Sequence, residues 1–115
     1  MNATEVGSEK RLSPRVDVQG HLRYRRIPIN VKGPRNAVVQ DVSTGGFRFR
    51  SDELLDRKSN MLLELYLPGC PIIRSLATVA WIKALPADDG YEIGGMFVEP
   101  SREARVELAK IVTEH

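Results

Sequence analysis

The chain is poor in the residues that build disulfide-linked or metal-bound scaffolds. Its 115 residues include one cysteine and two histidines. Cys70 can form no disulfide within the chain, and it lies between Gly69 and Pro71, whose residue types favour a turn. No group of histidine, cysteine and carboxylate residues has the spacing typical of a metal site. We therefore expect no metal site and no cofactor.

Long apolar segments are also missing. No run approaches the roughly 20 residues that a helix needs to cross a bilayer, and the N-terminal MNATEVGSEKR has no apolar core like that of a secretion signal. These absences predict a cytoplasmic protein without membrane insertion. No nucleophile and base pair can be nominated either, because acids such as Asp88 and Asp89 lie beside Gly90 in an expected solvated turn. We expect no enzymatic activity.

The length and the charge pattern indicate one domain with an uneven surface. A chain of 115 residues can bury one core, and the polar residues 1–10 predict a flexible tail before a domain over residues 11–115. A net charge of +2 argues against a dedicated DNA-binding protein. However, the segment 10–35 carries eight basic residues against one acid. It is either a solvated strand face or a surface for an anionic ligand.

Period-two alternation predicts strands through most of the chain. The segment 46–51 reads GFRFRS, which places Phe47 and Phe49 inward and both arginines outward. Trp81 falls in another such stretch, and we expect its ring in the core rather than near a ligand. Strands are also predicted around Leu22, Tyr24 and Ile27, around Val38, Val39 and Val42, and over 61–67, 72–85 and 91–98.

One helix is predicted at the C-terminal end. Apolar residues recur at helical spacing from Ala104 to Val112, and Ser101 is a suitable N-cap. Many short strands joined by tight turns, followed by one helix, indicate an all-β domain. Closure of the sheet into a barrel would remove free strand edges.

Two short motifs have complementary chemistry. Arg11 and Arg15 form an R-x-x-x-R pair, and Pro14 restricts the residue before it to extended conformations. Each arginine offers a planar fork of donors that fits a phosphate or the O6 and N7 acceptors of guanine. The segment 41–46 reads DVSTGG, a D-x-S-x-x-G pattern. Asp41 can accept from the N1 and N2 donors of guanine.

Neither motif is decisive alone. Arginine pairs recur by chance on protein surfaces, and D-x-S-x-x-G is also an ordinary tight turn in which Asp41 and Ser43 satisfy nearby amides. In that interpretation Gly45 and Gly46 supply positive φ. In the functional interpretation, the same glycines let a ligand approach the backbone.

Together, the two motifs and their order resemble the PilZ domain family over roughly residues 9–113. Further resemblance lies in FRF at 47–49, VAWI at 79–82 and YEIG at 91–94. The resemblance implies a six-stranded antiparallel β-barrel with a C-terminal helix that binds the bacterial second messenger cyclic di-GMP. It implies ligand contacts from Arg11, Arg15, Asp41, Ser43 and Gly46, with Gly45 and Lys10 as further candidates.

The resemblance also implies a mode of action. A single domain without an output module would change conformation on binding and signal by contact with a downstream protein that the sequence does not identify. Lys10 stands where an arginine in the family favours binding of an intercalated pair of ligands, so one or two ligands remain open. The alternatives are a PilZ-like adaptor that binds no nucleotide and a small barrel that binds single-stranded nucleic acid.

Overall fold

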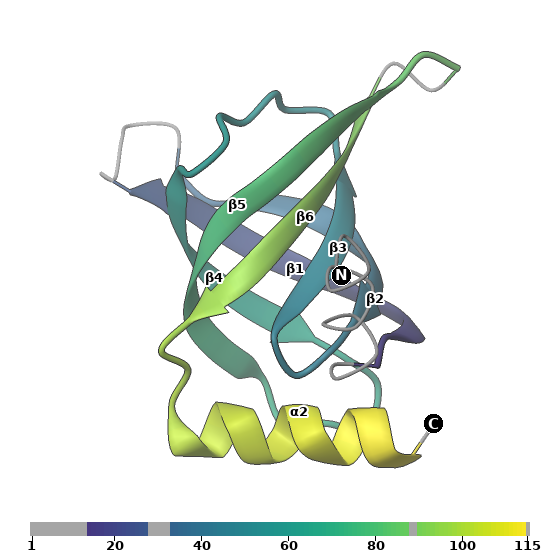
Figure 1. The fold of residues 1–115 in the computed structure, drawn as a ribbon, viewed down its shortest axis with the longest axis vertical. Helices are drawn as coiled ribbons and strands as arrows, with labels where there is room; N and C mark the ends of the chain where they lie inside the picture. The colour runs from purple at the N-terminus through teal and green to yellow at the C-terminus, as the bar shows by residue number, and fades with distance from the viewer. Residues whose placement is uncertain (1–13, 28–32, 88–89, 115) are drawn as a thin grey trace, which may run out of the picture.

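A closed barrel forms the domain in the computed structural model, which describes residues 14–27, 33–87 and 90–114. All neighbouring strands are antiparallel, and their order around the barrel is β1-β2-β3-β6-β5-β4 (Figure 1). The predicted six-stranded barrel is therefore confirmed. The strands are β1 (Val16–Ile27), β2 (Arg35–Val42), β3 (Gly46–Ser51), β4 (Asn60–Tyr66), β5 (Ile73–Leu85) and β6 (Gly90–Val98).

Apolar side chains at alternating positions along the strands fill the barrel interior. In β3, Phe47 and Phe49 are fully buried while the side chains of Arg48 and Arg50 lie outside, as the sequence predicts. The Phe47 ring packs against Phe97 at a centroid distance of 5.1 Å. Because closure pairs every strand on both sides, the barrel has no free edge.

The helix α2 (Arg102–Glu114) covers one end of the barrel (Figure 1). Ser101 is its N-cap, since the Ser101 Oγ accepts a hydrogen bond from the Ala104 amide at 3.1 Å. Ala104, Leu108 and Ile111 lie on its buried face. Within the described ranges, no helix is long and apolar enough to cross a membrane.

Trp81 lies on the outer side of β5, so the prediction that it belongs to the core was wrong. A β-bulge between Val79 and Trp81 changes which side chains face inward. Val79 is buried opposite Gly95, whereas Trp81 is half-buried opposite Gly94. A Cβ atom at Gly94 would overlap the indole ring, which therefore lies directly across β6.

Candidate functional site

Asp41 sits on the outer surface of the barrel near the end of β2. A bulge between Val39 and Asp41 separates the inward Val39 from Asp41, which pairs with the outward Arg48 of β3. Although it faces outward, the Asp41 side chain is only 5% exposed. A carboxylate buried to this degree requires charged or hydrogen-bonding partners.

Two arginines supply those partners, one to each carboxylate oxygen. The Nη1 of Arg15, directly before β1, lies 2.7 Å from Asp41 Oδ1. The Nη2 of Arg48 lies 2.8 Å from Oδ2, while its Nη1 donates to Glu92 on β6 at 3.3 Å. The arginine side chains are 44% and 35% exposed, although the Nε of Arg48 is buried and has no hydrogen-bond partner among the described residues. We call Arg15, Asp41 and Arg48 the Asp41 cluster.

Ser43 is engaged within the turn between β2 and β3. Its Oγ accepts from the amides of Gly45 at 3.2 Å and Gly46 at 3.0 Å. Its own amide donates to the Gly46 carbonyl at 2.8 Å. These bonds correspond to the structural interpretation of the motif, in which the serine organises the turn. They fix the backbone directly after Asp41.

The predicted positive φ at Gly45 and Gly46 was wrong. Among the described glycines, those with positive φ are Gly33 and Gly69, so Gly45 and Gly46 are not needed for a left-handed turn. Instead, a Cβ at Gly46 would overlap the carbonyl oxygen of Gly95 on β6. Glycine at position 46 therefore permits the close approach of β3 to β6.

The structure adds residues to the site that sequence reasoning had not assigned to it. Across four adjacent strands, the register places Asp41, Arg48, Gly94 and Trp81 in one row on the outer surface. The outward position of Arg48 was predicted from the alternation in β3, but its pairing with Asp41 depends on the strand register. Two sequence candidates, Lys10 and Arg11, lie outside the described residues.

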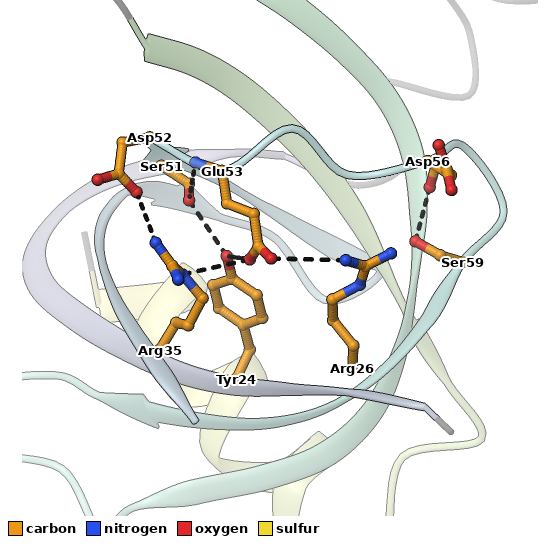
Figure 2. Close-up of polar contacts among 8 residues, drawn as sticks. All are labelled: Tyr24, Arg26, Arg35, Ser51, Asp52, Glu53, Asp56 and Ser59. Carbon is orange, nitrogen blue, oxygen red and sulfur yellow. Dashed lines mark hydrogen bonds and ion pairs between the residues drawn. The ribbon is translucent and has the colours of Figure 1, made fainter. Parts of the chain in front are cut away.

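A second carboxylate cluster lies at the barrel end away from α2 (Figure 2). Glu53, in the segment between β3 and β4, accepts a 2.6 Å hydrogen bond from the hydroxyl of Tyr24. Arg26 and Arg35 approach the same carboxylate at 3.5 and 3.3 Å. Burial, followed by the hydrogen bond to Glu53, raises the pKa of Tyr24 to about 12. We call these four residues the Glu53 cluster.

Metal binding finds no support in the described part of the chain. There, no three His, Cys, Asp or Glu side chains gather closely enough to hold a metal ion. The chemistry available at the Asp41 cluster is instead anion binding by arginine and hydrogen-bond acceptance by a buried carboxylate.

A small closed antiparallel barrel with an arginine and aspartate cluster on its outer surface, and a helix across one end, defines the class of this domain. The PilZ domain family model matches residues 9–114. The chain belongs to the PilZ domain family. No curated protein sequence matches it.

Solved structures agree with this fold. The chain is similar to the Bacillus subtilis inhibitor of motility (MotI/DgrA), with a TM-score of 0.74 and 16% identity over 89% of this chain. It is similar to MrkH of K. pneumonia, in a complex with c-di-GMP, with a TM-score of 0.72, 16% identity and 89% coverage. The chain spans about half the length of these two proteins, 48% and 49%.

A further similar structure has about the size of this chain. It is the PilZ domain of YcgR from Escherichia coli with c-di-GMP, with a TM-score of 0.69 and 11% identity. The match covers 89% of this chain and 88% of that domain. At such low identities, the likeness concerns the fold alone.

Proposed function

We propose that this PilZ domain is a receptor for cyclic di-GMP, and that the Asp41 cluster forms the centre of its binding site. The observation that carries the proposal is the nearly buried carboxylate of Asp41, held between two partly exposed arginines beside the D-x-S-x-x-G turn. Two structures similar in fold, MrkH and the YcgR PilZ domain, contain c-di-GMP, which supports this ligand class.

The side chains of the Asp41 cluster and of Trp81 match the chemical groups of the ligand. The free donors of Arg15 and Arg48 suit the phosphates and the O6 and N7 edge of guanine. Asp41 retains acceptor positions for the N1 and N2 donors of guanine. The half-buried Trp81, across Gly94 from Arg48, offers an aromatic surface on which a base can stack. Arg11, with Lys10, would add positive charge.

Binding requires Arg15 to change its partner. Because Asp41 is 5% exposed and Arg15 covers Oδ1, a guanine edge reaches the carboxylate only if the arginine moves. Arg15 then exchanges Asp41 for a phosphate or a base of the ligand. This exchange would carry the N-terminal segment with it and change the surface offered to a downstream protein. In this proposal the domain acts by contact and has no catalytic activity.

The alternative of single-stranded nucleic acid binding receives less support. That function needs several exposed aromatic side chains along one groove, and the two on which the alternative relied, Phe47 and Phe49, are fully buried. An adaptor that binds no nucleotide would have the same fold, so a binding experiment is needed to distinguish it from a receptor.

Calorimetric titration with cyclic di-GMP, run beside GTP, tests the proposal. The expected result is selective binding that Arg15→Ala weakens roughly ten- to a hundredfold, because one charge-assisted hydrogen bond contributes about 1.5–3 kcal/mol. The molar ratio decides between one and two ligands per protein, the question raised by Lys10. Absence of heat and of competition at high ligand concentration would favour the adaptor.

A further inference from the structure

A groove of about 530 Å³ lies on the outer surface of β1, β4 and β5, away from the row that contains Asp41. The register aligns its side chains in two cross-strand rows. One row runs from Arg25 through Leu62 to Leu76, and the other from Arg23 through Glu64 to Arg74. The groove therefore has one apolar row beside a charged row.

The two leucines of the first row are exposed. Leu62 and Leu76 pair across β4 and β5, and their exposed fractions are 43% and 44%. Two neighbouring leucines of this kind form a small apolar surface, and an apolar surface rimmed by charge is typical of a protein contact. Burying both leucines against a partner would contribute to affinity.

The charges around the groove are mainly positive. Glu64 accepts hydrogen bonds from Tyr66 at 2.7 Å and from Arg74 Nε at 2.9 Å. These two bonds, in that order, lower the pKa of Glu64, which keeps its carboxylate charged and occupied. Arg23 and Arg25 then remain as excess positive charge, and within the described ranges no ion pair involves Arg25.

The closed barrel limits how a partner can bind. No strand edge is free, so an extended peptide cannot add to the sheet. A partner must use side chains, and an amphipathic helix can present apolar and acidic residues on adjacent faces.

We propose that this groove docks an amphipathic, acidic helix of a partner protein, with apolar side chains over Leu62 and Leu76 and carboxylates toward Arg23 and Arg25. The proposal identifies the docking surface for the protein contact in the proposed function, and rests on that function only for the existence of a partner. It does not require nucleotide binding.

The test uses designed helical peptides and fluorescence anisotropy on the full chain, with and without cyclic di-GMP. A fluorescein-labelled peptide with leucine on one face and glutamate beside it should bind, and the same peptide with lysine for glutamate should not. Leu62→Glu should weaken binding about tenfold or more. Arg25→Glu should weaken it about fivefold. The matched control is Val106→Glu on α2, because Val106 is also 43% exposed.

Several outcomes would overturn the proposal. It is wrong if the acidic peptide does not bind at millimolar concentration, or binds Leu62→Glu and wild type equally. It is also wrong if single-stranded DNA or anionic vesicles bind wild type in place of the peptide and lose affinity in Arg25→Glu. The titrations are run with and without cyclic di-GMP. If the chain binds the peptide but not the nucleotide, the receptor function is refuted and the docking proposal stands.

Discussion

The Asp41 cluster and the Glu53 cluster are built from the same chemical groups, yet they are held differently. In each, two arginines approach one poorly exposed carboxylate. Glu53 has a third partner, the hydroxyl of the core residue Tyr24, which also lies 3.1 Å from Ser51 Oγ. Within the described residues, the side-chain donors that contact Asp41 belong to the two surface arginines, Arg15 and Arg48.

This difference separates a structural cluster from the proposed binding site. Tyr24 links Glu53 to the barrel core, so the Glu53 cluster fastens the segment between β3 and β4 across the barrel end (Figure 2). Removal of Glu53 would leave the buried Tyr24 hydroxyl with only the longer contact, to Ser51 Oγ, among these two partners. In the proposed function, guanine donors replace Arg15 at the Asp41 carboxylate, and a ligand phosphate accepts from the freed arginine, so the exchange costs little. The comparison predicts that substitutions in the Asp41 cluster mainly weaken ligand binding and that substitutions in the Glu53 cluster mainly lower the unfolding free energy.

Removal of Asp41 should have the largest effect, and it should fall on binding. Asp41→Ala removes the proposed acceptor of two guanine donors and should weaken cyclic di-GMP affinity about a hundredfold or more, by roughly 3 kcal/mol. Its unfolding free energy should change by less than about 1 kcal/mol, because the freed arginines are accessible to water. Calorimetry and urea denaturation measure the two quantities. Unchanged affinity would remove Asp41 from the site.

Removal of Glu53 should have the reverse pattern. Glu53→Ala takes the strongest acceptor from the buried Tyr24 hydroxyl and should lower the unfolding free energy by about 2 kcal/mol. The affinity of the folded variant for cyclic di-GMP should equal that of wild type. Urea denaturation and calorimetry on the same preparation check both statements. A large loss of affinity in a fully folded variant would contradict the division between the clusters.

High pH should weaken the Glu53 cluster through Tyr24. The raised pKa of about 12 means that the folded state favours the neutral phenol, whereas the unfolded chain loses this proton near its ordinary value of 10.0. The stabilisation is complete below pH 10 and is lost as pH rises towards 12, by on the order of 2 kcal/mol. In Tyr24→Phe this contribution is missing. Urea denaturation from pH 8 to 11 should therefore show a steeper decline for wild type, and parallel declines would disprove it.

The smallest effect is expected for Arg26. Its Nη1 lies 3.5 Å from Glu53 Oε2, the longest contact of the Glu53 cluster, and its side chain is partly exposed. Arg26→Ala should lower the unfolding free energy by no more than about 0.5 kcal/mol. Thermal denaturation beside wild type measures this change. A loss as large as that of Glu53→Ala would show that the cluster acts as one unit.

Much of the fold could be predicted because local patterns agree with it. The alternation in GFRFRS fixed the two faces of β3, and Ser101 marked the start of α2. These features depend on residues close together in sequence, where periodicity and capping operate.

The errors arose where tertiary structure overrides the pattern. The bulge after Val79 turned Trp81 outward, and no residue type in that stretch signals a bulge. Gly46 was assigned a positive φ in the turn, but a side chain at this position is excluded by the Gly95 carbonyl on another strand. The Glu53 cluster was not predicted at all, since its members come from three separate segments of the chain.

The most direct test of the receptor compares one arginine from each cluster. Cyclic di-GMP is titrated into wild type, Arg15→Ala and Arg35→Ala by calorimetry, with the fold of each verified by circular dichroism. Each substitution removes an arginine paired with a poorly exposed carboxylate. The account predicts that Arg15→Ala loses roughly ten- to a hundredfold in affinity while Arg35→Ala binds as wild type does. Equal affinities in all three proteins would contradict it.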